Sequence, residues 1–299
     1  MPSKQCERVV MVNDVQPRVR RREIVEADLP GVVDALVRGF PGRDRGHWER
    51  GLRRMGQRPS LTGCPRFGFL LEAGSGPVGV SLMLYDGVAA GDTLTLRCNL
   101  SSWTVDPAFR MQAPLLVASA LKRRDVTYTN ISPAPHTWAT IEAQGFSTYA
   151  VGQYVVLPLL ARARERVRVR RDAAAWRDLP EAGLLADHAG YGCHVLTVEA
   201  ADGLHPFVFL PFQARSGRVP LPLMQLIFCR DIAAVSRFAA ALGAALATRG
   251  SLGLVMDAPP EPGGPPVLRH VRRGRRYFRG PNPPRLGDLS YTERVIFGA

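Results

Sequence analysis

Bulky and polar residues alternate along Leu94–Trp103, which predicts a strand with one buried face. Val105–Pro107 ends the alternation, and an apolar helix is expected over Ala113–Leu121. A second strand is predicted at Val126–Ile131, and Gly145 and Phe146 close the segment. The junction from strand to helix points unpaired N–H groups and the positive end of the helix dipole outward. It is therefore predicted to bind a pyrophosphate.

The residues before this segment predict a strand, a helix and a hairpin. A strand is expected near Val19–Val25, followed by a helix over Pro30–Phe40 with Asp28 as its N-cap. Phe67–Glu72 and Val78–Asp86 are expected to pair as hairpin strands around a turn rich in glycine. The stretch between the helix and this hairpin is rich in Gly, Pro and Arg, and it contains His47 and Trp48.

The second half of the chain repeats this plan. Strands are predicted at His194–Val198 and Pro206–Pro211, around a turn at Asp202 and Gly203. A buried strand at Leu223–Cys229, a helix over Ile232–Thr248 and a strand at Leu252–Met256 follow. We therefore expect two α+β halves, each with a mixed, mostly antiparallel sheet flanked by helices.

The expected domain boundaries follow from this repeat. With 299 residues, the chain is long enough for two domains that each bury a core. We predict a flexible N-terminal segment over residues 1–17, a first domain over 18–160 and a second domain over 161–299. The second domain is expected to be a degenerate copy of the first.

Three landmarks of the first half resemble the GCN5-related N-acyltransferase superfamily. Val105–Leu115 is similar to the family pattern V-x-P-x-Y/F-R-x-x-G-x-G/A, with Ala113 in place of a glycine and Leu115 in place of the second small residue. Glu26–Pro30 resembles the family's first strand-to-helix junction, and Ile141–Phe146 resembles its closing Y-E-x-x-G-F motif. The resemblance covers roughly residues 20–158.

The resemblance implies an acyl-CoA co-substrate, acetyl-CoA or another acyl-CoA, and a set of contacts to it. The end of the fourth family strand and the following loop hold the thioester and the phosphates, and an Asn at the end of the fifth strand contacts the cofactor arm. In this sequence the matching residues are Trp103, Thr104, Val105, Arg110, Met111, Gln112, Ala113, Pro114, Leu115 and Asn130. Arg110 also suggests an anion from its own chemistry, because a guanidinium at a helix start is unfavourable without one.

The general acid of the reaction is not identified by the motifs. The family often uses a Tyr of the closing motif to protonate the leaving thiolate, and this chain has Ile141 at that position. Tyr128 and His136 are the candidates carried forward, and Ser132 and Tyr149 are further substitutes. The structural alternatives are core packing for Trp103 and Val105, a surface position for Arg110 and a turn for Asn130.

The two halves differ at the strand-to-helix junction. The second half passes from Cys229 to Ile232 through Arg230 and Asp231 only. A carboxylate at the N-cap satisfies the helix N–H groups and repels phosphate. One CoA site per chain, in the first half, is therefore predicted.

Charge and composition narrow the class of protein without naming a partner. The formal net charge is +13, and nearly all basic residues are arginine, since Lys4 and Lys122 are the only lysines. The arginines form either a solvated surface or a face that binds an anion such as CoA, nucleic acid or acidic lipid.

Cysteine and histidine usage points to a cytoplasmic protein without metal. The five cysteines are scattered, which fits a reducing compartment, and no histidine has the spacing of a metal site. The first 22 residues lack the apolar core of a signal peptide, and Arg237 interrupts the most apolar helix, so no membrane span is expected. The sequence leaves the oligomeric state open.

The favoured function is an acyl-CoA-dependent N-acyltransferase that moves an acyl group to an amine of a small molecule or peptide. The acetyl group is the favoured acyl group, and transfer is direct, within one ternary complex. One alternative is an aminoacyl-tRNA-dependent transferase, which has the same tandem plan and would use the positive charge to bind tRNA. Nucleic acid is a less favoured partner, because few aromatic residues accompany the arginines. The other alternative is an acyl-CoA-binding module without catalysis, suggested by Ile141 and Leu115.

Overall fold

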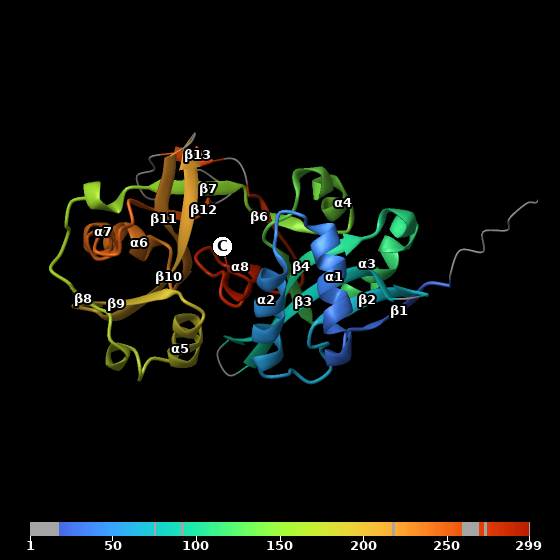
Figure 1. Ribbon diagram of the computed structural model, residues 1–299. Helices are drawn as coiled ribbons and strands as arrows, with labels where there is room; N and C mark the ends of the chain where they lie inside the picture. Colours follow the sequence, from blue (N-terminus) through green and yellow to red (C-terminus); the bar gives the residue numbers. More distant parts are fainter. Residues whose placement is uncertain are drawn as a thin grey trace, which may run out of the picture.

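The computed structural model describes residues 18–74, 76–90, 93–216, 219–258, 269–271 and 274–298. The predicted flexible segment 1–17 lies outside this part of the chain. The described residues form two halves that lie side by side, each built on one sheet (Figure 1).

The first sheet has seven strands in the order β1-β2-β3-β4-β5-β14-β6. Its strands are β1 (Arg20–Glu23), β2 (Gly68–Ala73), β3 (Gly76–Ala90), β4 (Thr93–Val105), β5 (Val126–Asn130), β14 (Arg276–Arg279) and β6 (Ser147–Ala150). All neighbouring strands are antiparallel except β4 and β5, which are parallel. The parallel pair requires a crossover, and the helix predicted after Pro107 provides it.

The second sheet also has seven strands, in the order β13-β7-β12-β11-β10-β9-β8. Its strands are β13 (Arg269–Val271), β7 (Gly152–Val156), β12 (Gly253–Ala258), β11 (Val219–Cys229), β10 (Gly203–Ser216), β9 (His194–Ala200) and β8 (Arg168–Arg170). Again a single pair, β11 and β12, is parallel. The expectation of two mixed, mostly antiparallel sheets is confirmed.

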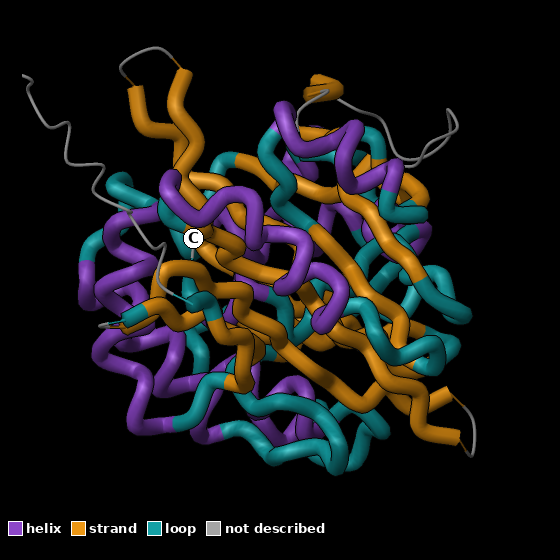
Figure 2. The backbone as a smooth tube through the Cα atoms, turned by 90° about the vertical axis from the view of Figure 1, so that its right-hand side faces the viewer, coloured by secondary structure: helices purple, strands orange, loops and turns teal. Residues whose placement is uncertain are grey.

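The halves exchange one strand each. β7 precedes residue 160 but pairs with β12 and β13 of the second sheet. β14 follows residue 160 but lies between β5 and β6 of the first sheet. Figure 2 views the molecule from the side of the first half, with the strands in orange. Two strands therefore cross between the sheets on either side of the boundary predicted at residue 160.

Helices cover both faces of each sheet. They are α1 (Leu29–Gly39), α2 (Arg45–Gln57), α3 (Ala113–Ala120), α4 (Trp138–Ala143), α5 (Ala182–Gly190), α6 (Ala233–Arg237), α7 (Ala239–Ala247) and α8 (Glu293–Ile296). Short 3-10 helices are η1 (Glu26–Asp28), η2 (Pro107–Gln112), η3 (Pro135–Thr137), η4 (Pro158–Leu160) and η5 (Ala173–Ala175). The stretch rich in Gly, Pro and Arg thus contains a helix, α2. Asp44 is its N-cap, because the Asp44 carboxylate accepts a hydrogen bond from the His47 N–H.

The alternation of side chains along β3 divides the core of the first half. Leu82 and Leu84 pack with α1 and α2, whereas Met83 packs with α3 and α4 on the opposite face. Ile296 of α8 joins the α1 and α2 cluster, and Figure 1 places α8 between the two halves. The end of the chain that is described therefore contributes to the core of the first half.

The second half has the same layering. α6 and α7 pack on one face of the sheet and α5 on the other. The single helix expected over 232–248 is interrupted at Phe238, whose backbone leaves the helical region at φ −102° and ψ 15°. Its ring is buried and lies edge-on to Phe207 at 6.3 Å, so packing onto the sheet accompanies the break.

Candidate functional site

β4 and β5 separate part-way along their length. Their parallel pairing runs from Leu96 and Val126 to Asn99 and Thr129 and then stops. β4 continues to Val105, whereas β5 ends at Asn130. A gap between neighbouring strands therefore opens in the first sheet after Asn99.

A β-bulge lies at this gap. β3 pairs Val80 with Thr104 and Leu82 with Ser101, so Ser102 and Trp103 together face one residue of β3. Ser102 has a φ of +50°, in the left-handed region that residues other than glycine rarely adopt. A bulge takes backbone groups out of the sheet ladder and turns them toward a neighbouring site.

A cavity of about 540 Å³ passes through the gap. On one face of the sheet it is lined by Phe40, His47 and Trp48 of the α1 and α2 side. On the other face it is lined by Val117 of α3 and His136 before α4. The gap thus connects the two faces of the sheet, which is the arrangement needed for two substrates that meet from opposite sides.

The segment around α8 closes one side of this cavity. The N–H of Glu293 donates to Oδ1 of Asn99 at 2.9 Å, and the hydroxyl of Ser132 donates to the Glu293 carboxylate. Phe297 packs on Trp48 with ring centroids 5.6 Å apart. These contacts place Glu293, Arg294 and Phe297 on the wall of the cavity.

His47 is positioned on the α2 side by two aromatic rings. Its ring lies 4.9 Å from Trp48 and 5.8 Å from Phe297 between centroids. Burial, followed by the charges of Arg43 and Arg50, lowers the pKa of His47 below its ordinary value. The imidazole is therefore neutral near pH 7 and able to accept a proton.

The structure brings four of the predicted residues to the cavity, namely Trp103, Asn130, Ser132 and His136. Thr104 packs against α1, where a Cβ on Gly39 would lie only 2.1 Å from its Oγ1. Val105 lies beside Gly79 of β3, where a Cβ added to Gly79 would lie 3.1 Å from Cγ2 of Val105. Thr104 and Val105 therefore fix the end of β4 and do not line the cavity.

The predicted phosphate loop is partly used by the fold itself. Residues 107–112 form the 3-10 helix η2, and the N–H of Ala113 donates to the carbonyl of Arg110. Pro114 has no N–H, so the amides of these two residues are not available to a phosphate. Met111 and Leu115 are exposed and do not fill the cavity, whose lining on α3 begins at Val117.

The remaining members of the loop lie at its surface. Arg110 is exposed and Gln112 is half-buried, and neither lines the cavity. The two proline rings at Pro107 and Pro114 fix the backbone of the junction at its start and at the first turn of α3.

Tyr128 does not line the cavity. Its side chain is buried in the cluster beneath α3 and α4, and its hydroxyl accepts a hydrogen bond from the N–H of Arg123 at 3.3 Å. Burial raises the pKa of Tyr128 to about 12. Tyr149 is also buried and does not line the cavity, whereas Ser132 does.

In the second half the corresponding gap is occupied by the chain. β11 and β12 pair from Leu223 and Gly253 to Gln225 and Val255. Beyond this point the N–H of Leu289 donates to the Ile227 carbonyl at 2.7 Å, and the N–H of Cys229 donates to the Gly287 carbonyl at 2.9 Å. Residues 287–289 thus pair with the strand edge that is open in the first half.

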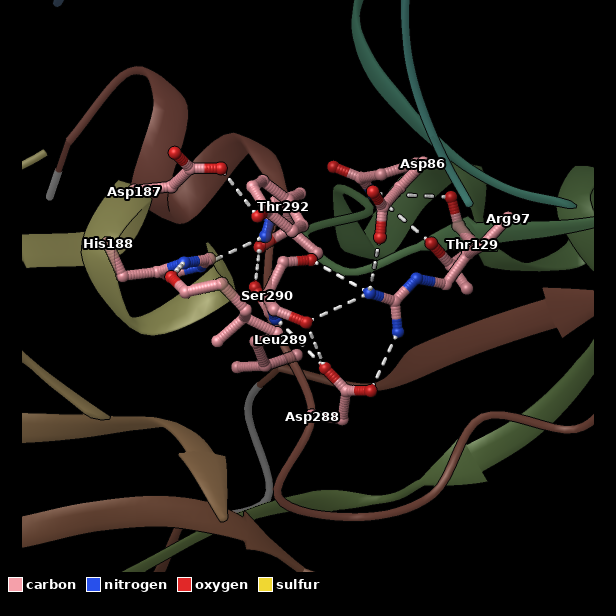
Figure 3. Close-up of polar contacts among 12 residues, drawn as sticks. Asp86, Arg97, Thr129, Asp187, His188, Asp288, Leu289, Ser290 and Thr292 are labelled. Carbon is pink, nitrogen blue, oxygen red and sulfur yellow. Dashed lines mark hydrogen bonds and ion pairs between the residues drawn. The ribbon is translucent and has the colours of Figure 1, made fainter. Parts of the chain in front are cut away.

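A buried polar network holds this inserted segment (Figure 3). Arg97 of β4 makes an ion pair of 3.0 Å with Asp288 and one of 3.5 Å with Asp86. It also donates to the carbonyl and the hydroxyl of Ser290, each at 3.0 Å. Although burial opposes ionisation, Arg97 and Arg285 hold the pKa of Asp288 below its ordinary value.

Sequence reasoning missed His47, Glu293, Arg294 and Phe297 as site residues. They come from α2 and from the α8 segment, which are far apart in the sequence, and they follow no motif spacing. The α8 segment also resembles no landmark of the first half. Only the tertiary fold brings these residues together.

Comparisons with known proteins identify the fold. No protein-family model matches the chain, and no curated protein matches its sequence. A GCN5-related N-acetyltransferase from Anabaena variabilis superposes with a TM-score of 0.58 at 11% identity, over 88% of this chain and 72% of that one. A GCN5-related N-acetyltransferase from Kribbella flavida gives 0.53 at 15%, over 89% and 72%.

Eis1 from Mycobacterium abscessus superposes with a TM-score of 0.51 at 11% identity, over 88% of this chain and 73% of that one. The chain has the fold of the GCN5-related N-acetyltransferases. The expected resemblance is thereby confirmed for the fold, and the match covers both halves. In this fold the gap between β4 and β5 corresponds to the strand ends at which the sequence resemblance placed the thioester.

Two further features concern membranes and metals. In the ranges that the structure describes, no helix is long and apolar enough to cross a bilayer. Within the same ranges, His, Cys, Asp and Glu side chains form no group of three or more that could hold a metal ion.

Proposed function

We propose that this protein is an acyl-CoA-dependent N-acyltransferase with one active site per chain, in the first half. The observation that carries the proposal is the cavity that crosses the first sheet between β4 and β5, from His47 on one face to His136 on the other. The fold shared with GCN5-related N-acetyltransferases supports the reaction class. We take an acetyl group as the first acyl group to test.

The donor enters from the face covered by α3 and α4. Trp103 and Asn130 line the gap there, next to Val117 and Ile141. The apolar wall suits the pantetheine arm. The exposed Met111 and Leu115 lie at the start of α3, where the sequence resemblance places the phosphates. Because the Ala113 amide is already bonded, we assign the phosphate contacts to the later amides of the first turn and to Arg110.

The acceptor enters from the face covered by α1 and α2. Its amine nitrogen attacks the thioester carbonyl carbon, a C–N bond forms, and the C–S bond breaks to release CoA thiolate. Backbone N–H groups at the bulge of Ser102 and Trp103 stabilise the developing oxyanion. Both substrates are held at once, so no acyl-enzyme is required.

Proton transfer is assigned to the two histidines of the cavity. His47, neutral near pH 7 and on the acceptor side, takes the proton that the amine loses. His136, on the donor side, supplies a proton to the departing thiolate. Ile141 lines the cavity where the family often has a Tyr, so the acid must come from another position.

We expect one site per chain rather than two, because the strand gap of the second half is filled by the chain itself. Residues 287–289 pair with β11 there, and the Asp231 carboxylate accepts the Ala233 N–H at 2.9 Å at the start of α6. Neither a thioester nor a pyrophosphate has a place at this junction.

The test is a titration with acetyl-CoA, combined with release of free CoA thiol across a panel of amines. One equivalent of acetyl-CoA is expected to bind per chain. Val117→Phe, which fills the cavity, is expected to weaken binding at least tenfold, whereas Ala118→Phe, at an exposed neighbouring position of α3, serves as the matched control. Two bound equivalents, or equal affinity in Val117→Phe, would contradict the assignment.

Mass spectrometry of the natively purified protein separates the alternatives. Retained CoA species support the proposal. Binding of acetyl-CoA without thiol release for any amine supports a binding module, and co-purified tRNA supports an aminoacyl-tRNA-dependent transferase.

A further inference from the structure

A second cavity adjoins the first on the acceptor side. Its volume is about 560 Å³, and it lies between the loop after α1 and strands β10 and β11 of the second sheet. Arg43 and Arg294 line both cavities, and Arg249 lines the second. The two spaces therefore meet at a pair of guanidinium groups.

None of these three arginines makes an ion pair among the residues that the structure describes. Twelve other arginines make ion pairs with carboxylates, among them Arg38, Arg45 and Arg58. In the part of the chain that the structure describes, no carboxylate lies within ion-pair distance of Arg43, Arg249 or Arg294. Three cations face one space there without a matching anion.

Arg294 is the most enclosed of the three. Its Nε is buried and has no hydrogen-bond partner among the described residues. Its guanidinium lies 6.0 Å from the centroid of the Phe212 ring. Burial, then the charge of Arg276, lowers the pKa of Arg294 from its ordinary value, although the charges of Glu293 and Asp257 oppose this shift. The planar donor group is therefore partly enclosed, with charges of both signs near it and a buried Nε that has no partner among the described residues.

The nearby carboxylates are engaged elsewhere. Glu293 accepts the Ser132 hydroxyl, and Asp257 forms a buried ion pair of 2.6 Å with Arg276. Neither makes an ion pair with Arg294. The donors of Arg294 are thus not used by these carboxylates and are left for an anion that comes from outside this set of residues.

We propose that the acceptor is an amine that also carries an oxyanion, either a carboxylate or a phosphate, and that Arg294 and Arg43 bind this group at the junction of the two cavities. The inference rests on the proposed function and specifies the substrate class for that site. Arg249 adds positive charge at the far side of the second cavity and favours entry of the anion.

The test uses pairs of amines that differ in the anion. L-Phenylalanine is compared with 2-phenylethylamine, and O-phosphoethanolamine with ethanolamine, at saturating acetyl-CoA. Thiol release is expected to give a kcat/KM at least about tenfold higher for the anionic member of one pair, as expected for a charged hydrogen bond. The pair that shows the preference tells whether carboxylate or phosphate is recognised.

Variants then assign the preference to residues. Arg294→Gln and Arg43→Gln are each expected to reduce the preference at least about tenfold, mainly through KM. Arg45→Gln is the matched control, because Arg45 lies two positions from Arg43, carries the same charge and already pairs with Asp34. Arg294→Lys keeps the positive charge but loses the planar guanidinium with its paired donors, so its preference for the anionic amine is expected to be intermediate. A preference that persists in both Gln variants would overturn the inference.

Calorimetry separates this inference from the proposed function. O-Phosphoethanolamine and L-phenylalanine are titrated into the CoA-bound protein, where no transfer takes place. If no amine releases thiol, binding of either probe that Arg294→Gln weakens tenfold still supports the anion site, and absence of binding overturns it. If neutral amines are acylated as fast as anionic ones, the inference is wrong and the acyltransferase assignment stands.

Discussion

The side-chain oxygen of Asn99 accepts a hydrogen bond from the backbone N–H of Glu293 at 2.9 Å. Asn99 is the last residue of β4 that pairs with β5, and its amide also donates to the Thr129 carbonyl at 3.3 Å. One buried side chain therefore joins the point where the strands separate to the start of α8. The wall of the cavity depends on this connection.

Asn99→Ala is expected to destabilise the protein by about 1–3 kcal/mol, because it leaves the part-buried Glu293 N–H without its acceptor. Acyl transfer should fall with it, since Glu293 and Phe297 lose their position in the cavity wall. Urea unfolding and thiol release measure the two effects. Asn282→Ala, at an exposed position, is the control, and equal stability of the two variants would contradict the role given to Asn99.

Gly51 and Phe297 fix the same wall from the α2 side. A Cβ on Gly51 would lie 1.9 Å from Cδ1 of the Phe297 ring, so Gly51→Ala is expected to displace the ring and to cost about 1–3 kcal/mol. Gly56→Ala in the same helix meets its nearest atom at 3.5 Å and is the control. In a double-mutant cycle, Phe297→Leu should relieve part of the loss, and strict additivity would show that the two residues do not couple.

The elements of both halves could be predicted because their signals are local. The alternation of Leu94–Trp103 lies inside β4, and Asp202 and Gly203 mark the turn between β9 and β10. Exchange of β7 and β14 between the sheets could not be predicted. Arg276–Arg279 is a short strand whose pattern specifies no neighbour, and the place it takes is decided by packing against β5 and β6.

Site residues could be predicted from the sequence only where the path of the backbone, such as the end of a strand, places them. Trp103 and Asn130 reach the cavity because strand ends define the gap, whereas Thr104 points into the contact with Gly39. The Ala113 amide was expected to be free, but the 3-10 helix before α3 uses it. Arg294 carried no sequence signal, because its environment is assembled from segments distant in the chain.

His188 should make the stability depend on pH. It lies between the Leu184 carbonyl, 2.7 Å from Nδ1, and the Tyr291 N–H, 3.2 Å from Nε2, so the buried ring is held in its neutral form. Burial lowers its pKa to about 4. A proton on Nε2 would remove the acceptor for Tyr291, whose φ of +55° needs support from its surroundings.

The folded state therefore resists protonation that the unfolded state accepts near pH 6.5. This contribution is fully present above pH 6.5 and is lost as the pH falls toward 4, for a total of about 3 kcal/mol. Urea unfolding of His188→Gln and of the unchanged protein at pH 7, 6 and 5 measures it. The variant should show a smaller loss over this range, and parallel curves would exclude the assignment.

Arg276 and Asp257 form a buried ion pair between the two sheets. Arg276 lies on β14 of the first sheet and Asp257 on β12 of the second, with side chains 1% and 3% exposed. Asp257→Asn leaves the arginine charge buried without its partner and is expected to cost about 3–5 kcal/mol. Thermal and urea unfolding should show this loss, with a much smaller effect for Asp172→Asn in the exposed pair with Arg170.

Replacing both members tests whether the pair contributes stability or specificity. Arg276→Met with Asp257→Leu removes both charges and is expected to recover most of the stability lost in Asp257→Asn. Strand exchange between the sheets would then depend on packing alone. A double variant as unstable as the single one would mean that the orientation of the pair is itself required.

His47 is the residue on which the direction of proton transfer depends. It is on the acceptor side of the gap, and its lowered pKa keeps it neutral at pH 7. His47→Gln is expected to lower kcat/KM roughly 100-fold without weakening acetyl-CoA binding, since a general base contributes about 10²–10⁴ to the rate. The rate of the unchanged protein should fall as the pH drops through the pKa of His47, below 6.5, because the protonated ring cannot accept a proton.

The pH profile distinguishes this role from a packing role beside Trp48. His47→Gln should lose the acidic limb of the profile, whereas His205→Gln, in the second half next to Asp202, should keep both rate and profile. If His47→Gln retains the limb and Glu293→Gln loses it, the base is the carboxylate on α8. In that case the neutral histidine only orders the aromatic wall, and the amine is deprotonated from the side of the strand gap held by Asn99.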